Sequence, residues 1–562
     1  FEVQFQKIIL DKGQLNYADA SQPEIKMIKA PQLSVTLEGF HYPLHPMVSA
    51  DHLFYSDDIT LDIKHLRPVM TNGDSLSIEQ LSFSKNDALI NLNTLRFAQA
   101  NGATSALFPN IRIMGFDPHA YLNDRRLKLD SLKLIAPEII HDQSVSENNQ
   151  RLSQNALPET IDIDYISSVS TEIEFRNHLK STSYAMHKGQ FEVRKFFIEG
   201  TFTWKRFFEY AQYAAISGHD LIVPLDDGYQ LSVAHYDLHH PTKTLRLDNI
   251  NLTSEYTPSE YTKTLTYQKD WFDVDADNIT LSGLDFQRSL GKREFYTGKL
   301  AIGGLKALIY RDKSVPLNTS VVKELPQGML RNIEQWIHID TLQVKGDITH
   351  QIKPENREEI AEITFNALNA SLFQVTTADH MVNGPMRLVS NGKLADTAPF
   401  KAIAVFDMND PKNPFSFSGQ IDQMPLDALN KLLRPLANIN IKDGYAERIG
   451  FSMKGNNDIA TGEMNFHYED LKIQILNPET YDMQGLNQEI KTFFANTFVI
   501  KQNNPTFLVL RPGTIFQRRD PSRVIFHYWG EALLSGAVSS IGINKSRKDE
   551  KKYDKEVEAN SH

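Results

Sequence analysis

The sequence predicts a mainly β protein, an elongated and curled many-stranded antiparallel sheet with a few short helices. One eight-residue apolar pattern recurs along the 562-residue chain. Turn-forming Gly, Asn and Asp residues separate most of the strand-like segments, and few segments show the periodicity of a helix. These signals mark roughly 25–30 candidate strands. Because open sheets rarely exceed about ten strands, such a sheet must curl, split or form a repeat-like body.

The recurring pattern is apolar–x–apolar–x–x–apolar–x–apolar. The eight copies with polar, Gly or Pro residues at every x span residues 28–35, 35–42, 76–83, 127–134, 245–252, 274–281, 337–344 and 466–473. Alternation at period two describes a strand with one buried face. The central step of three would turn the later apolar residues to the other face, unless a β-bulge or bend absorbs the extra residue. The pattern therefore predicts bent strands that keep one apolar face.

Composition excludes several classes of protein. The chain has 41% hydrophobic and 23% charged residues, as expected for a globular protein. Its net charge of −11 argues against binding nucleic acid. It has no cysteine, which rules out disulfides, thiol nucleophiles and cysteine-bound zinc. The chain starts in strand-like sequence at Phe1, so we expect a signal peptide or an anchor helix upstream.

Four regions are expected along the chain. Residues 1–150 form an N-terminal β segment and 151–311 a central β segment with a helix near 201–216. Residues 312–543 form a C-terminal β region with short helices, and 544–562 are a charged disordered tail. The short helices of the C-terminal region are expected near residues 327–336, 425–436 and 486–500.

The C-terminal third carries a more specific signal. It contains Gly419-Gln420-Ile421-Asp422 followed by Met424-Pro425-Leu426, Gly462-Glu463-Met464-Asn465-Phe466, Asn503-Asn504-Pro505, Arg518-Arg519-Asp520 and Leu533-Leu534-Ser535-Gly536. These segments resemble the AsmA-like envelope proteins of Gram-negative bacteria, in a branch catalogued as a domain of unknown function. The resemblance covers most of the chain and is clearest from about residue 277 to 543.

The resemblance implies an inner-membrane anchor, a body in the periplasm and a taco-like β groove with an apolar lining, of which residues 1–150 would form the N-terminal part. It also implies a role in outer-membrane biogenesis, with a phospholipid or another acyl-chain lipid carried in the groove and envelope proteins as possible partners. The anchor would precede Phe1, and the relatives thought to span the periplasm are longer than this chain.

The apolar face is the main candidate site. It could form an open groove that solvates acyl chains, or the closed core of a sandwich, because both use the same alternation. The candidate groove residues belong to two copies of the pattern: Leu127, Leu129, Leu132, Leu134, Leu245, Leu247, Ile250 and Leu252.

The segment 526–543 would gather apolar side chains on one side of a helix. The candidates for docking to a membrane or a partner are Tyr528, Trp529, Leu533, Val538 and Ile541. Tyr and Trp suit a membrane interface. The alternative is a helix that caps the end of the sheet, which the absence of Lys and Arg on its polar side favours.

Charged and polar clusters give weaker signals. His235, Asp237 and His239 share one strand face and could offer a metal two ligands, although a polar strand face is the simpler explanation. Arg518, Arg519 and Arg523 could hold a lipid phosphate or carboxylates of a partner, while Asp520 between them favours local ion pairs. We expect no metal and no cofactor.

None of the catalytic motifs G-x-S-x-G, H-E-x-x-H, P-loop or G-x-G-x-x-G occurs. The absence of these motifs argues against an enzyme, and the apolar face together with the resemblance implies a non-catalytic protein that binds or transfers lipid. A closed-core β scaffold that recruits envelope proteins is the alternative, and a β-rich carbohydrate-active enzyme with paired carboxylates is a third possibility.

Overall fold

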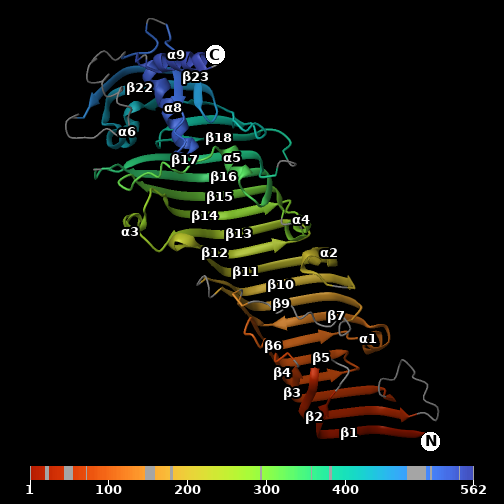
Figure 1. Ribbon diagram of the computed structural model, residues 1–562. Coiled ribbons are helices and arrows are strands. Elements are labelled where there is room, and N and C mark those ends of the chain that lie inside the picture. The colour runs from red at the N-terminus through yellow and green to blue at the C-terminus, as the bar shows by residue number, and fades with distance from the viewer. Residues whose placement is uncertain are drawn as a thin grey trace. The chain divides into compact units, whose positions relative to one another are not determined.

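The computed structural model describes residues 2–18, 25–42, 55–70, 72–142, 144–145, 158–177, 182–200, 202–291, 294–355, 357–378, 382–476, 502–506, 509–543 and 545–560. Within them the chain is mainly β, with 24 strands and few short helices, which confirms the predicted fold class (Figure 1). The chain divides into two compact units. The first comprises 1–248 and 284–292, and the second comprises 249–283 and 293–562.

The first unit is a series of strands, most of which pair with the next strand along the chain (Figure 1). Its strands are β1 (Val3–Tyr17), β2 (Ile25–Tyr42), β3 (Asp58–Met70), β4 (Ser75–Ser84), β5 (Leu89–Ala98), β6 (Thr104–Met114), β7 (Arg126–Ile135), β8 (Glu138–Asp142), β9 (Thr160–Asn177), β10 (Thr182–Glu199), β11 (Ala211–Pro224) and β12 (Tyr229–His239). Its helices are α1 (Pro118–Asp124), α2 (Phe207–Tyr210), α4 (Phe286–Gly291) and the 3-10 turns η3 (Trp204–Arg206) and η4 (Asp226–Gly228).

The second unit combines further strands with the longest helices. Its strands are β14 (Trp271–Ser282), β15 (Glu294–Asp312), β16 (Trp336–Lys353), β17 (Ala361–Thr376), β18 (Met386–Leu394), β19 (Ala398–Phe406), β20 (Phe415–Ile421), β21 (Met424–Pro425), β22 (Ile439–Gly455), β23 (Ile459–Ile475) and β24 (Gly513–Arg518). Its helices are α3 (Pro258–Thr264), α5 (Pro326–Arg331), η6 (Leu426–Leu429), α6 (Asn430–Ala437), α8 (Ile525–Ser540) and α9 (Lys545–Asn560). Strand β13 (Thr244–Ser254) contributes residues to both units.

Most strand pairs are antiparallel, as predicted, but three are parallel. Strand β9 pairs in parallel with both β7 and β8, and β15 pairs in parallel with β16. A parallel pair needs a long crossover in place of a tight turn. The segment that joins β15 to β16 through α5 supplies one, so the mainly antiparallel sheet contains some parallel pairs.

The predicted bends occur at the centre of the apolar pattern. In three copies the second central residue has a left-handed backbone: Gly39, Asn249 and Asp470 have φ of 60°, 50° and 53°. In two others the left-handed residue lies across from the centre on the neighbouring strand, Thr94 with φ 52° and Gly304 with φ 64°. A left-handed residue at a bulge restores the alternation, which keeps one face apolar.

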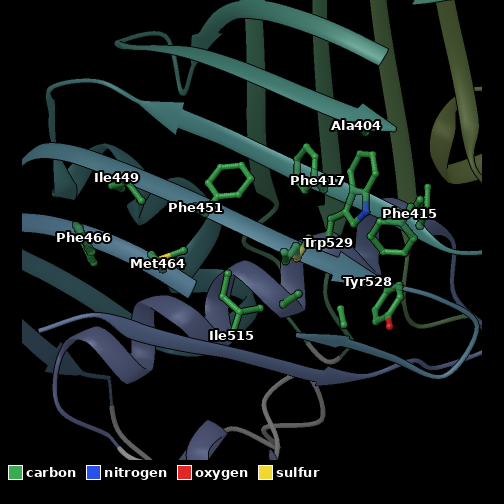
Figure 2. Packing of buried hydrophobic residues seen from close by; sticks show 14 of the residues in the cluster. Ala404, Phe415, Phe417, Ile449, Phe451, Met464, Phe466, Ile515, Tyr528 and Trp529 are labelled. Atoms are coloured by element: carbon green, nitrogen blue, oxygen red, sulfur yellow. The ribbon is translucent and has the colours of Figure 1, made fainter. Parts of the chain in front are cut away.

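Among the residues that the structure describes, the largest hydrophobic core lies in the second unit and has thirty buried residues, whereas the cluster in the first unit has eight. In the second unit Trp529 of α8 stacks on Phe417 of β20, with ring centroids 4.0 Å apart and planes inclined by 10° (Figure 2). The Phe415 ring lies 6.1 Å from that of Trp529, and Ile515 and Met464 belong to the same cluster. Helix α8 therefore closes the apolar face of β20–β24.

The helix expected over 201–216 is mostly absent. Only η3 and the single turn of α2 are helical, and β11 begins at Ala211. The aromatic spacing fitted a helix, but Ala211 and Ala214 pair in register with Phe196 and Val193 of β10. Tertiary pairing along β10 thus overrides the local periodicity.

The expected disordered tail is also corrected, because residues 545–560 form helix α9. Lys, Glu and Arg favour helices even without an apolar stripe. Helix α9 packs on β24, where the ring of Tyr553 lies 6.0 Å from that of Phe516 and Arg518 lies over the same Tyr553 ring.

The other expected helices have mixed outcomes. The helix near 425–436 is confirmed by η6 and α6, which together span residues 426–437. The helix near 327–336 is shorter than expected, because α5 ends at Arg331 and β16 begins at Trp336. The helix near 486–500 lies outside the described residues. Within the described part of the chain, no helix is both long enough and apolar enough to cross a bilayer.

Candidate functional site

The first unit carries an apolar row that crosses ten strands in register. Each residue of the row is the direct cross-strand partner of the next, and such partners point to the same face. We call this set the first apolar row: Leu10, Val35, Leu61, Phe83, Ile90, Ile113, Leu132, Ile166, Val193 and Ala214. Nine strand spacings of about 4.8 Å make it about 43 Å long.

A second apolar row runs beside the first on the same face. It consists of Gly13, Leu33, Ile63, Leu81, Leu92, Ile111, Leu134, Ser168, Phe191, Ile216 and Leu238. Only Gly13 and Ser168 interrupt its apolar character. The two rows together form a continuous apolar face on β1–β11, with a contribution from β12.

The positions between the two rows point to the opposite face and are nearly all polar. This polar row consists of Ser34, Asp62, Ser82, Asn91, Arg112, Lys133, Ser167, Glu192, Ala215 and His239. Its side chains form hydrogen bonds across strands; the Asn110 side-chain amide donates to Oδ1 of Asn91 at 2.8 Å, and Gln80 donates to Asp62 at 2.6 Å. The sheet of the first unit is therefore amphipathic across its thickness.

Burial along the first apolar row changes from one end to the other. Leu10 on β1 is 48% exposed, the members from β2 to β9 are partly buried, and Val193 on β10 is completely buried. A row in a closed sandwich core would be buried throughout. The side chains of this row on β1–β9 thus keep partial access to solvent, whereas Ile63 and Ile111 of the second row are buried.

Aromatic side chains cover the buried end of the apolar face. Phe202, Phe207 and Phe208 come from the segment around α2 and pack on the cluster that contains Phe196 and Val193. The Phe207 and Phe196 rings lie 5.9 Å apart. The sequence analysis missed this cover because it assigned the segment to one long helix. The dense aromatic residues at 202–213 are the signal that marked it as part of a core.

The predicted groove residues on β7 all lie on the apolar face. Leu132 and Leu134 belong to the two apolar rows, and Leu127 and Leu129 continue the same face beyond the bend. Leu129 is 4% exposed and the other three are partly buried. Lys128, Asp130 and Lys133 alternate with these residues and are exposed.

The other predicted groove residues lie on β13. Leu245, Leu247 and Leu252 are partly buried and Ile250 is 5% exposed, while Arg246 and Asn249 between them are exposed. Alternation about the bend at Asn249 is thus present here too. Leu245 and Leu247 belong to the first unit, and Ile250 and Leu252 to the second.

The candidate docking residues of the C-terminal segment are mostly inside the core of the second unit. Tyr528, Trp529, Val538 and Ile541 are buried there, and Leu533 is partly buried. This burial favours the alternative of a helix that caps the sheet. Phe526, which is 73% exposed, is the apolar residue of α8 that does face solvent.

The histidine cluster on β12 makes local contacts. His235 and His239 lie on the polar face with Asp237, as the spacing predicted. His235 Nδ1 lies 3.4 Å from a carboxylate oxygen of Asp248, and His239 Nε2 lies 3.2 Å from the Tyr213 hydroxyl. In the described parts of the chain, no three His, Asp or Glu side chains are grouped closely enough to hold a metal.

The arginines near the C-terminus have different surroundings. Arg518 pairs with Glu556 of α9, and the Arg519 side chain donates to the main-chain oxygen of Lys323 and to Asn457. Arg523 approaches Asp520 only at 3.9 Å. Local pairs therefore account for the first two arginines but leave Arg523 weakly paired.

Two comparisons with known proteins add no relative. No protein-family model matches the chain, and a search of curated proteins gives no match. The functional argument therefore depends on the geometry of the apolar face.

Proposed function

We propose that this chain binds glycerophospholipid or another acyl-chain lipid on the apolar face of its first unit. The carrying observation is the pair of in-register apolar rows, of which the first keeps partial access to solvent from β1 to β9, with a polar row on the opposite face. Each lipid methylene that leaves water on such a face contributes about 0.8 kcal/mol. One bilayer leaflet is about 15 Å of hydrocarbon, so a row of about 43 Å offers room for more than one acyl tail.

The cellular setting is part of the same proposal. Lipid binding on a long β face agrees with the resemblance to AsmA-like proteins, and we therefore place the chain in the periplasm of a Gram-negative bacterium, anchored in the inner membrane, where it would support outer-membrane biogenesis. Binding is passive: acyl tails lie on the apolar rows, head groups face solvent, and no residue performs covalent chemistry.

A second candidate function is a closed-core scaffold that recruits envelope proteins. The observation that favours it is the covered core of the second unit, where α8 buries Tyr528 and Trp529. The scaffold would carry no lipid, and the two functions differ in that outcome.

The test is organic extraction of the purified chain followed by lipid mass spectrometry, with an unrelated β protein prepared in the same way. We expect near-stoichiometric phospholipid from the native chain. The double variant Phe83→Asp/Ile90→Asp introduces charge at a cross-strand pair of the first apolar row and should lose the lipid. Asn91→Asp, one position away on the polar face, is the matched control and should retain it.

A folded native chain without lipid would contradict the proposal and favour the scaffold. Equal lipid in the double variant and in Asn91→Asp, with both folded by circular dichroism, would show that lipid binds elsewhere.

A further inference from the structure

The second unit contains a group of cationic side chains, and not all of them form close ion pairs with its carboxylates. Arg311 and Lys313 come from the end of β15 and the residue after it, and Arg523 comes from the turn before α8. Arg311 is neutralised by Asp270 through two hydrogen bonds of 2.6 Å. The other two cations have no such partner.

The pairing of Arg523 and Lys313 is weak. Arg523 lies 3.9 Å from Asp520 and donates to the side-chain oxygen of Gln268 at 3.4 Å. Among the described residues, no carboxylate lies within 4.0 Å of the Lys313 ammonium. Glu531 of α8 is close enough to act electrostatically on Lys313, and burial raises the pKa of that carboxyl.

These cations are removed from water. The side chain of Arg523 is only 20% exposed. Burial lowers the pKa of Lys313, and the nearby Arg523 and Arg311 lower it further. Burial likewise lowers the pKa of His527, which is therefore a neutral donor or acceptor beside the cations at pH 7. Desolvated cations that their counterions pair only weakly are stabilised when a further anion joins them.

The cation group adjoins an apolar part of the sheet. Phe272, Ile309 and Ile363 lie in register with His350 across β14–β17. Arg311 follows Ile309 by two residues and points to the same face. The ring nitrogen Nε2 of His350 is buried and has no hydrogen-bond partner among the described residues. A molecule with an apolar tail and an anionic end would match both parts of this surface.

We propose that Lys313 and Arg523, with His527 as a neutral hydrogen-bonding group, bind the phosphate of an anionic lipid whose acyl tail lies along Phe272, Ile309 and Ile363. This inference rests on the proposed lipid-binding function and deepens it by assigning a head-group site in the second unit. Ammonium and guanidinium groups are the donors that bind phosphate oxygens most strongly.

The experiment is a calorimetric titration of the full chain with three soluble probes. Dihexanoyl phosphatidic acid carries tail and phosphate, dihexanoylglycerol carries the same tails without the phosphate, and glycerol 3-phosphate carries the phosphate without tails. We expect phosphatidic acid to bind at least tenfold more tightly than either of the others, and Lys313→Gln to remove at least tenfold of that affinity. Lys306→Gln, at an exposed position of the same strand, should leave it unchanged.

The outcomes separate this inference from the proposed function. Equal affinity for phosphatidic acid and dihexanoylglycerol would overturn the head-group site and leave lipid binding in place. Glycerol 3-phosphate binding as tightly as phosphatidic acid would mean that the site takes a soluble phosphate ester, which also overturns the proposal. Absence of binding for both lipids would contradict the proposed function itself. Lys313→Gln removes a desolvated charge, so it should fold at least as stably as the native chain.

Discussion

Trp529 is the side chain that contributes most visibly to closing the second unit. It is 7% exposed, stacks on Phe417 and lies within 6.2 Å, ring to ring, of Phe406 and Phe415. We expect Trp529→Ala to lower the free energy of unfolding by about 3–5 kcal/mol, because truncating a buried aromatic residue leaves a cavity. Urea unfolding measures this change.

Phe526→Ala is the control for that measurement, because Phe526 is 73% exposed in the same helix. Its effect should stay within about 0.5 kcal/mol. If both variants lost the same stability, the burial of α8 described above would be wrong.

His527 should give the stability of the second unit a dependence on pH. Burial lowers its pKa from 6.5 to about 4, and Arg523 and Lys313 add to the effect. As the pH falls below 6.5, the unfolded chain binds the proton before the folded chain does, so stability decreases between about pH 6.5 and 4. The side chain is 40% exposed, so solvent screening reduces the size of the effect.

The measurement compares native chain and His527→Gln by urea unfolding between pH 7.5 and 4.5. The native chain should lose more stability than the variant over this interval. The charged groups that act on the imidazole are Arg523, Lys313, Asp520, Arg311 and Glu531, and they remain in both proteins. Parallel pH profiles would contradict the low pKa of His527.

At the scale of the element, helix α8 approaches β24 very closely at one glycine and not at another. A Cβ added to Gly536 would lie 2.7 Å from Cγ1 of Ile515 and 3.1 Å from Cβ of Met464, whereas one added to Gly530 would meet nothing within 4 Å. We expect Gly536→Ala to destabilise the fold by about 1–3 kcal/mol through overpacking.

Gly530→Ala, one and a half turns earlier, should stabilise the fold by about 0.5–1 kcal/mol, because alanine loses less entropy in a helix. Thermal unfolding of the two variants checks both signs. A stabilising Gly536→Ala would show that α8 and β24 are further apart than described.

The strands were more predictable from sequence than the helices, for a physical reason. A strand with one apolar face needs only an alternation of apolar and polar residues and a bend. Residues close together in the sequence determine both features, as in Leu127–Leu134. The segment around Phe207 has the local spacing of a helix, but its partner on β10 decides its structure. Helix α9 depends on the helix propensities of Lys and Glu and on contacts of Tyr553. Its sequence has no apolar periodicity from which the helix could be predicted.

The apolar face could be predicted from the sequence, but how far other side chains cover it could not. The pattern places Leu132 and Leu134 on one face whether or not another layer covers it. The cover depends on residues distant in sequence, such as Phe202 over the first unit and Trp529 over the second. The cation group of Lys313 and Arg523 likewise joins residues more than 200 positions apart, so spacing alone could not reveal it.

At the scale of the whole molecule, the two units should differ in local stability. The second unit has a core cluster of thirty buried residues and the first a cluster of eight. Elements with few buried apolar contacts open more readily. We expect amides of β2–β5 to exchange hydrogen at rates roughly ten times or more faster than those of β19–β23. Hydrogen–deuterium exchange with mass spectrometry of the lipid-free chain measures this difference, and uniform protection would contradict it.

The registered rows of the first unit also constrain how its length can change. Each strand that the rows cross adds one residue to a row, so gain or loss of one residue within such a strand would turn every following side chain of that strand to the wrong face. A complete pair of strands, in contrast, could be gained or lost and the rows would simply become longer or shorter. Insertion or deletion of one hairpin during evolution would therefore lengthen or shorten the apolar face of the first unit. The sequences of the remaining strands would not have to change.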